Sequence, residues 1–539
     1  MSLAARLATA LVCGAAVGLA YPPYGWWPLL LPGLVGALAV LDGRRPRDGA
    51  VLGLAFGLTY MAVMLPWVQV IGPDAWIALT VLEALFYGVF GWAATWVRPY
   101  PWWPLATAGL WAGVELARST VPFTGFPWGK IAFALADTPV AGLVRYLGVP
   151  GLGALIVGCA AVAWWGVQRC RNAAGSHAAP VPTVGAAIAA WAGVAAVLAL
   201  GALVPVGLAG PVAAGGGVRV AAVQGGIPGD GADGLGEQRE VVDNHARATE
   251  EYAAAVEAGT ADPADVVFWP ENSTDIDPLS DPETYARIDG AVDSVGVPVL
   301  VGALLAGSEP GTLRNAGLVW SPSTGPGDVY VKVNLVPFGE FIPMRDLLAP
   351  LVSRLDEVPR DFVAGDQPGV LDLGPVVVGD AMCYDVAFEQ VAAPAVAGGA
   401  EMLVVQTNNA TYRDSGQPAQ QWAISRLRAL ETGRDLVVAS TNGISGIVRA
   451  DGTVVAKSTT RGAQVLTGTV QRATGITPAV RVGAWVERGL VGVGVLGLLV
   501  ALVGAAVARS RRAGGGAHRL EPGPRREPVP SGTGGTGPA

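Results

Sequence analysis

One cysteine stands where a catalytic nucleophile would be placed. Cys383 lies in the stretch GDAMCYDVAFE, directly after an apolar run over residues 376–382 that predicts a buried strand. A helix is predicted over residues 386–396, so the cysteine falls at a strand-to-helix turn. A helix N-terminus favours a thiolate, and its free backbone N–H groups can face a developing oxyanion. The alternative is a buried structural thiol, which behaves as a small apolar side chain.

A nucleophilic thiol needs a base, and histidine is the usual one. The chain has three histidines, and His245 is the one in the same polar segment, within the charged stretch VVDNHARATEE. These surroundings predict a solvated helix residue rather than a base. Neither HExxH nor paired-cysteine spacing occurs, so no metal is expected. The base is therefore expected to be a carboxylate or a lysine.

Two ionisable residues of the same segment lie at the ends of β-type runs. Glu271 ends DVVFWPE, and Lys332 lies near the end of the run over residues 328–333. Strand ends are where sheet proteins gather their ligand-binding groups. Considered singly, each of the two is more often solvated than catalytic.

The apolar residues are concentrated before about residue 205. Hydrophobic residues make up 51% of the chain and charged residues 14%, which is typical of a membrane protein. Runs of about 18 or more apolar residues are long enough to span a bilayer. Seven spans are predicted before the polar segment and an eighth after it, over residues 4–20, 27–42, 49–71, 75–97, 102–117, 147–168, 183–205 and 486–508. A cleaved signal peptide is the alternative for the first span, but no small-x-small site precedes YPPYGWW.

Arginines in the short loops predict the orientation of these spans. They follow the second, fourth, sixth and eighth spans, as Arg44, Arg45, Arg47, Arg98, Arg169, Arg171, Arg509, Arg511 and Arg512. The positive-inside tendency then places these loops and both termini in the cytoplasm, and the polar segment outside it. The fifth loop opposes this assignment, because it carries Arg118, Lys130 and Arg145. We expect a multi-pass protein of the plasma membrane with an extracytoplasmic domain.

The polar segment alternates short β-type runs with helical stretches, which predicts an α/β domain with helices packed on sheets. Strands are predicted over residues 218–224, 265–271, 297–303, 314–320, 328–333, 376–382, 401–407 and 435–441, and helices over 237–258, 281–294, 386–396 and 417–432. The expected domains are a membrane domain (1–210), the α/β domain (215–481), a last transmembrane helix (484–508) and a cytoplasmic tail (509–539). The tail is rich in Gly, Pro and Arg and is expected to be disordered.

Three motifs together resemble a known catalytic set. WPEN with Glu271, KVNLVPFGEFIP with Lys332 and Glu340, and GDAMCYD with Cys383 resemble the Glu-Lys-Cys set of the nitrilase (carbon–nitrogen hydrolase) superfamily. The span arrangement, GFPWGK in the fifth loop and the stretch over residues 407–446 resemble one member family, the apolipoprotein N-acyltransferases. The resemblance covers nearly the whole chain except the tail. It implies a multi-span α-helical membrane domain joined to a nitrilase-like αββα sandwich.

The resemblance also implies a reaction and a set of roles. A phospholipid would donate the acyl chain of its sn-1 ester, and a diacylglyceryl lipoprotein would accept it on the α-amino group of its N-terminal cysteine. Cys383 would carry the chain as a thioester, with Glu271 as base and acid. Lys332 and the backbone N–H of Tyr384 would stabilise the oxyanion, while Glu340 and Asp385 would keep Lys332 charged and placed. Neither a cofactor nor a nucleic acid is expected.

Some residues differ from the family pattern, and some alternatives to this interpretation stay open. Asp385 stands where the family commonly has Glu, and residues 408–411, NNAT, stand where it has N-D-A-W, so Asn409 replaces an acid. The segment over residues 341–355 is either a lid that touches lipid or an ordinary packed helix. The alternative functions are a membrane-tethered amidase that uses water as acceptor, and a scaffold for a polyprenol-phosphate mannose synthase.

Overall fold

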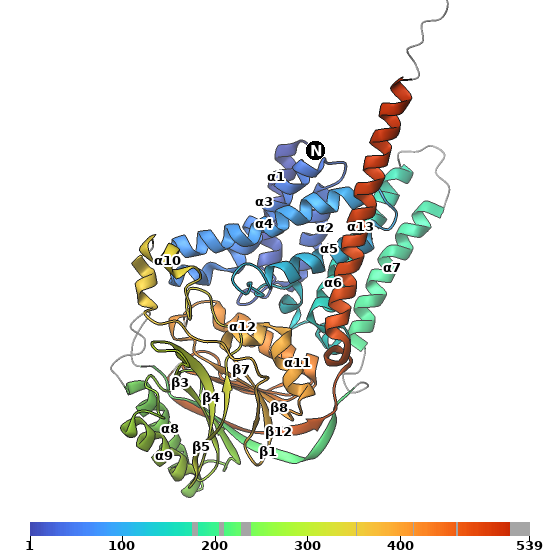
Figure 1. The fold of residues 1–539 in the computed structure, drawn as a ribbon. Coiled ribbons are helices and arrows are strands. Elements are labelled where there is room, and N and C mark those ends of the chain that lie inside the picture. Colours follow the sequence, from blue (N-terminus) through green and yellow to red (C-terminus); the bar gives the residue numbers. More distant parts are fainter. Residues whose placement is uncertain are drawn as a thin grey trace, which may run out of the picture.

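The computed structural model describes residues 1–174, 182–203, 210–227, 239–351, 353–412, 414–459 and 462–517. A bundle of helices lies at one end of the molecule and two β-sheets at the other, and the last helix runs back along the bundle (Figure 1). That helix, α13, covers Pro478–Ala517 and so continues past the predicted end of the eighth span. The remainder of the tail expected to be disordered, residues 518–539, lies outside the described residues.

Each predicted span has a helix in the bundle. These helices are α1 (Leu3–Gly18), α2 (Leu30–Val40), α3 (Pro46–Met64), α4 (Pro73–Val97), α5 (Trp103–Arg118), α6 (Val144–Ala174), α7 (Pro182–Leu203) and α13. By length and composition, three helical stretches of the described chain are apolar enough to cross a membrane on their own: Pro73–Val97, Ala141–Arg171 and Pro478–Arg511. Shorter apolar helices such as α1 pack among them, and most buried apolar side chains of the bundle belong to one cluster, while Cys159, Ala163 and Val194 form a separate small one.

The two sheets form the expected sandwich. The first sheet has the strand order β12-β1-β2-β3-β4-β5, and the second β11-β10-β9-β8-β7-β6. All eight predicted strands are confirmed, as β1 (Val212–Gln224), β2 (Val266–Phe268), β3 (Val299–Ala306), β4 (Leu313–Ser321), β5 (Gly325–Val331), β7 (Val377–Met382), β8 (Met402–Thr407) and β9 (Leu436–Ser440). Four were not predicted: β6 (Val370–Asp372), β10 (Gly446–Val448), β11 (Val454–Lys457) and β12 (Gln464–Thr474). The strands β1, β2 and β3 are parallel, as are β7, β8 and β9.

Alternating side chains divide the domain into layers. In β1, Val220 and Ala222 pack into the core between the sheets, whereas Ala221 and Val223 pack under the outer helices. Those outer helices are α8 (Glu240–Glu257) and α9 (Pro282–Val295), which cover the first sheet. The second sheet is covered by α11 (Glu389–Ala397) and α12 (Gln417–Thr432), which lie between it and the bundle (Figure 1). This order confirms the αββα sandwich.

The expectation that His245 is solvated is wrong. The His245 side chain is buried in α8, its Nδ1 lies 2.7 Å from the Val241 carbonyl oxygen, and its ring packs 5.9 Å from that of Trp269. Burial lowers the pKa of His245 to about 4, so the ring is neutral at pH 7. The charged sequence neighbours lie on the other face of the helix, which is why the local pattern concealed its burial.

The bundle and the sandwich are joined by polar contacts within an apolar interface. Lys130, in the loop between α5 and α6, donates to both carboxylate oxygens of Glu389 at 2.9 Å. The Gln420 side-chain oxygen accepts from the indoles of Trp67 and Trp128, at 2.9 and 2.8 Å. Buried ion pairs and amides of this kind need their partners in place, so they define how the two parts meet.

Candidate active site

Four strand ends meet at one edge of the sandwich, and each supplies a polar group. Glu271 follows β2, Lys332 follows β5, Cys383 follows β7, and Asn408 follows β8. Gly302 in β3 makes room for the first of these, because a Cβ there would lie 2.1 Å from the Pro270 carbonyl oxygen and 2.7 Å from the Glu271 Cα. The structure therefore brings together the three residues that the motifs single out.

Lys332 lies between two carboxylates. Its Nζ is 2.9 Å from Oε1 of Glu271 and 2.9 Å from Oε1 of Glu340, and its side chain is 1% exposed. Burial alone lowers the pKa of Lys332, but the charges of Glu271 and Glu340 outweigh it, and the pKa is raised well above the ordinary lysine value. The ammonium is thus a fixed positive charge inside the site. The solvated alternative for Lys332 and Glu271 is wrong, since both are buried.

A second residue organises the same two carboxylates. Asn315, in β4, donates its side-chain amide to Glu271 at 2.8 Å and to Glu340 at 2.9 Å. The other oxygen of Glu271 accepts from the backbone N–H of Asn408 at 2.9 Å. Asn315 was not among the predicted site residues. The available signal was an amide directly before the apolar run over residues 316–320, where a buried polar group requires partners.

Cys383 occupies a strained backbone position at the turn after β7. Its φ is +46°, in the left-handed region that costs a side chain other than glycine about 1–2 kcal/mol. It opens the short 3-10 helix η9 (Cys383–Ala387), whose first backbone N–H groups have no acceptor within the helix. The turn therefore presents the sulfur and adjacent N–H groups at the same edge, as a nucleophile beside an oxyanion site requires.

The resting thiol of Cys383 is protonated, so a base is needed to form the thiolate even though the residue opens a helix. Cys383 keeps part of its surface open to solvent, yet its sulfur lies among buried groups. Burial raises the pKa of the Cys383 thiol to about 12; the charge of Glu271 adds to the rise, and Lys332 and a hydrogen bond with Thr407 oppose it. A thiol of this kind attacks only when a base takes its proton, which is the role that Glu271 is placed to fill.

This protonation state predicts a distinctive pH dependence of alkylation. Below its pKa the thiolate fraction of Cys383 rises tenfold per pH unit, so the rate of reaction with iodoacetamide is expected to climb about tenfold per unit from pH 7 to 10. The rate is followed by mass spectrometry of the peptide that contains Cys383, with N-acetylcysteine as the control, whose rate levels above about pH 8.5. A plateau for Cys383 below pH 9 contradicts the raised pKa.

Tyr384 and Asp385 hold the turn in place from opposite sides. The Tyr384 hydroxyl donates to the Gly125 carbonyl of the α5–α6 loop at 2.9 Å, and its ring stacks on Trp128 with centroids 6.3 Å apart. Asp385 accepts from the backbone and side-chain nitrogens of Asn334, at 2.8 and 2.9 Å, and from the Tyr330 hydroxyl at 2.8 Å. Asp385 thereby ties the nucleophile turn to the strand end that carries Lys332, and its charge also favours the lysine ammonium.

Apolar and aromatic side chains of both parts of the chain lie near the site. Tyr412 meets Trp67 edge-on, with ring centroids 5.3 Å apart, and Phe338 meets Phe123 at 5.9 Å. The segment over residues 341–355, for which a lid and a packed helix are the alternatives, contains the short helix α10 (Arg345–Leu348), then the 3-10 helix η7 (Ala349–Leu351) and the start of η8 (Ser353–Glu357). Met344 and Leu347 expose apolar side chains there. Arg354 of the same segment lies 3.0 Å from Asp74 at the start of α4. An apolar surface here suits a substrate with acyl chains.

The departure at Asn409 is explained by its neighbours. Its side-chain nitrogen donates to Gln417 and Gln421, both at 2.8 Å, and its oxygen accepts from Ser440 at 2.9 Å. The amide supplies a donor that a carboxylate lacks, so it satisfies this buried network. No group of three or more His, Cys, Asp or Glu side chains in the described ranges is arranged to hold a metal ion.

Two family models match this chain, one over the helical bundle and one over the sandwich. Residues 13–162 match the apolipoprotein N-acyltransferase N-terminal domain, and residues 219–477 match the carbon-nitrogen hydrolase family. Among solved structures, an amidase of the nitrilase superfamily from Nesterenkonia AN1 aligns at 20% identity and a TM-score of 0.33, over 46% of this chain and 90% of that one.

Curated relatives match over nearly the full length. The apolipoprotein N-acyltransferase of Mycolicibacterium smegmatis is 36% identical over 514 residues, covering 93% of this chain and 85% of the relative. That of Gloeobacter violaceus is 30% identical over 455 residues, covering 81% and 82%. Both parts of the chain, the helical bundle and the sandwich with its candidate site, fall within these matches. The chain therefore belongs to the apolipoprotein N-acyltransferase family.

Proposed function

We propose that this protein transfers an acyl chain from the sn-1 position of a phospholipid to the N-terminal diacylglyceryl cysteine of lipoproteins. The observation that carries the proposal is the buried ammonium of Lys332, held between Glu271 and Glu340 beside a protonated nucleophile at Cys383. The family supports this substrate class, and aromatic side chains of the bundle lie beside the site, such as Trp67 against Tyr412. The transfer of the acyl chain, first to Cys383 and then to the acceptor amine, needs no nucleotide or metal.

The first half-reaction forms a thioester. Glu271 accepts the proton of the Cys383 thiol while the sulfur attacks the ester carbonyl carbon. Lys332 and the backbone N–H of Tyr384 stabilise the resulting oxyanion, a contribution of about 3 kcal/mol for one such donor. Collapse breaks the bond to the glycerol oxygen, which takes the proton from Glu271 and leaves as a lysophospholipid. The acyl chain remains on Cys383.

The second half-reaction consumes the thioester. The α-amine of the acceptor, with an ordinary pKa of about 8, is partly neutral near pH 7 and attacks the thioester carbonyl. Glu271 accepts a proton from the nitrogen, and the tetrahedral intermediate expels the Cys383 sulfur, which recovers its proton. The product is an amide, more stable than the ester that supplied the acyl chain. The same carboxylate thus serves as base and acid in turn.

Transfer to an acceptor distinguishes the proposed activity from hydrolysis. Membranes that contain the protein are incubated with an alkyne-tagged phospholipid and a synthetic peptide beginning with diacylglyceryl cysteine, and the tagged peptide is detected by mass spectrometry. We expect a tagged amide, and none when the peptide's amine is acetylated beforehand. Tagged free fatty acid in place of the amide would favour the amidase. If neither forms, the favoured function becomes a scaffold that anchors a polyprenol-phosphate mannose synthase.

We also propose that the bundle is a multi-pass membrane domain over residues 1–210, completed by the helix over 484–508, with the domain over 215–481 outside the cytoplasm. The cations of the fifth loop no longer oppose this orientation. Arg118 lies 2.6 Å from Glu83 with both side chains buried, Lys130 pairs with Glu389, and Arg145 is buried. Cations neutralised or buried inside the protein do not act as free loop charges in the positive-inside tendency.

The exposed Cys170 near the end of α6 tests this orientation. A membrane-impermeant maleimide is expected to leave Cys170 unlabelled in intact cells and to label it after permeabilisation. Asp328→Cys is the matched control, because residue 328 is exposed on the sandwich and is expected to be labelled without permeabilisation. Mass spectrometry of the two cysteine peptides reads the result. Labelling of Cys170 in intact cells reverses the proposed orientation.

A further inference from the structure

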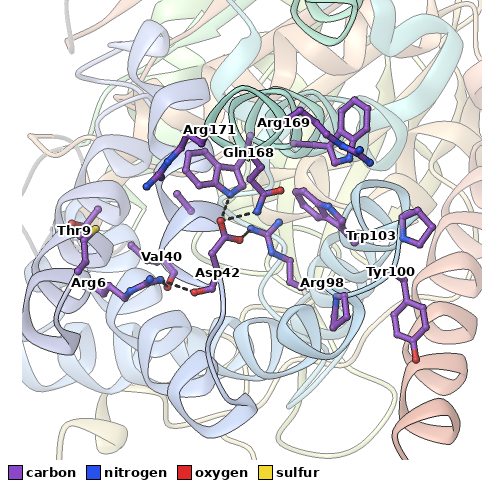
Figure 2. Close-up of a pocket in the computed structure, with 17 residues that line it drawn as sticks. Arg6, Thr9, Val40, Asp42, Arg98, Tyr100, Trp103, Gln168, Arg169 and Arg171 are labelled. Atoms are coloured by element: carbon purple, nitrogen blue, oxygen red, sulfur yellow. Dashed lines mark hydrogen bonds and ion pairs between the residues drawn. The ribbon is translucent and has the colours of Figure 1, made fainter. Parts of the chain in front are cut away.

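A polar cavity lies at the end of the helical bundle away from the candidate active site. Its volume is about 690 Å³, within the range of ligand sites, and its lining joins α1, the turn between α2 and α3, the turn between α4 and α5, and the end of α6 (Figure 2). Trp103, which lines it, begins α5, and Arg118 ends that helix next to the loop that contacts Tyr384. Sixteen residues of helix separate these ends, about 24 Å, close to the thickness of a bilayer core.

Cations dominate the lining. The lining contains four arginines, Arg6, Arg98, Arg169 and Arg171, and one carboxylate, that of Asp42 (Figure 2). The carboxylate of Asp42 already has three donors. Its oxygens accept from Arg98, from the indole of Trp164 at 2.7 Å and from the side-chain amide of Gln168 at 2.8 Å. The charges of Arg6, Arg169 and Arg171 are therefore left without a counter-ion from this lining.

Two of these arginines, Arg6 and Arg98, pack into the wall of the cavity and each keeps one N–H donor without an acceptor among the described residues. The Arg98 side chain is 8% exposed and stacks 3.8 Å over the Trp103 ring, and its Nη1 is buried without a hydrogen-bond partner in the part of the chain that the structure describes. Arg6 donates through Nη1 to the carbonyls of Val40 and Asp42, at 2.6 and 3.0 Å, while its Nε is likewise buried and unsatisfied. Unmet donors of buried guanidinium groups are costly, and an anion would satisfy them.

We infer that this cavity binds a phosphate-bearing anion, and that the anion is the headgroup of an acidic phospholipid lying at this face of the membrane. Guanidinium groups match phosphate oxygens in geometry as well as charge. Basic pockets between membrane helices are suited to such headgroups. The aromatic rings of Trp103, Trp164 and Trp165 in the lining suit the apolar-to-polar boundary where a headgroup lies. This site is separate from acyl transfer, because its lining shares no residue with the catalytic set.

Photo-crosslinking locates the anion directly. The full-length protein is placed in phosphatidylcholine vesicles that contain a diazirine-bearing phosphatidic acid, irradiated, and mapped by mass spectrometry. We expect labelled peptides that cover residues 98–103 and 164–168. The double variant Arg169→Gln/Arg171→Gln is expected to reduce this labelling about thirtyfold, since each arginine near a headgroup contributes about a factor of five. Both side chains are exposed, so the variant preserves the packed wall.

The matched control removes the same charge elsewhere on the same face. Arg509→Gln/Arg511→Gln changes two exposed arginines of α13 that do not line the cavity, and labelling is expected to stay within twofold of the wild type. Millimolar inorganic phosphate, added before irradiation, distinguishes a lipid headgroup from free phosphate as the bound anion. Labelling that persists identifies a lipid headgroup. Labelling that is lost identifies free phosphate and overturns the lipid assignment. Absence of label at these peptides, or an equal loss in both variants, overturns the site.

Discussion

Cys383→Ala is expected to abolish acyl transfer, with a fall in rate on the order of 10⁴-fold or more, because the variant has no atom that forms the thioester. The measurement is a trap of the acyl-enzyme. Membranes with the wild type or the variant are incubated with an alkyne-tagged phospholipid, and the protein-bound tag is tested for release by neutral hydroxylamine, which cleaves thioesters. We expect a releasable tag on the wild type and none on the variant.

The other cysteines provide the control for this experiment. Cys170 is exposed at the far end of α6, and Cys170→Ala is expected to carry the tag as the wild type does. The left-handed backbone at residue 383 makes alanine a substitution that keeps the local strain, so equal membrane levels of both proteins are expected. Acyl transfer retained by Cys383→Ala would remove the cysteine from the mechanism.

The elements that were predictable are those that a local pattern determines. Strands such as β7 and β8 are buried on both faces, so their sequences are near-continuous apolar runs. The helices α8 and α9 show the periodicity of a helix that buries one face. The candidate catalytic residues were singled out because the motifs around Glu271, Lys332 and Cys383 are specific, whereas each residue alone pointed to a solvated or structural role.

What was missed depends on contacts between distant segments. The strands β6 and β10 have three residues each, which is too short to show the alternation of buried and exposed side chains. The strand β11 has four residues, mostly exposed, at the edge of its sheet. Asn315 gains its importance only when β4 brings it between Glu271 and Glu340. The raised pKa of the Cys383 thiol likewise comes first from its burial in the folded chain and then from the charge of Glu271, which is distant in sequence.

The placement of the site explains why the chain combines two such different parts. Tyr384 directly follows Cys383, yet its ring and hydroxyl pack on the α5–α6 loop of the bundle. Gln420 of α12 accepts from Trp67 and Trp128 of the same part. The nucleophile turn is therefore positioned by the bundle as well as by the sheet, and a soluble fragment of the sandwich would lose these contacts.

Lys332→Met is expected to block thioester formation and also to destabilise the protein. Methionine retains much of the side chain's length but leaves the buried carboxylates of Glu271 and Glu340 without their cation, a change that costs about 3–5 kcal/mol for a buried pair. Loss of one oxyanion donor alone lowers the rate about 10²–10³-fold. The tagged-phospholipid trap measures the first effect, and the thermal unfolding midpoint of the detergent-solubilised protein measures the second.

A second variant separates the two effects. Lys332→Met/Glu340→Gln removes one cation and one carboxylate together, so the buried charge is nearly rebalanced, and it is expected to regain part of the lost thermal stability without regaining the thioester. Lys457→Met is the matched control, because Lys457 is exposed on β11, and it is expected to match the wild type in both measurements. A thioester on the rebalanced variant would mean that Lys332 serves only to hold the carboxylates; its absence in a stable protein assigns the ammonium to the reacting oxyanion.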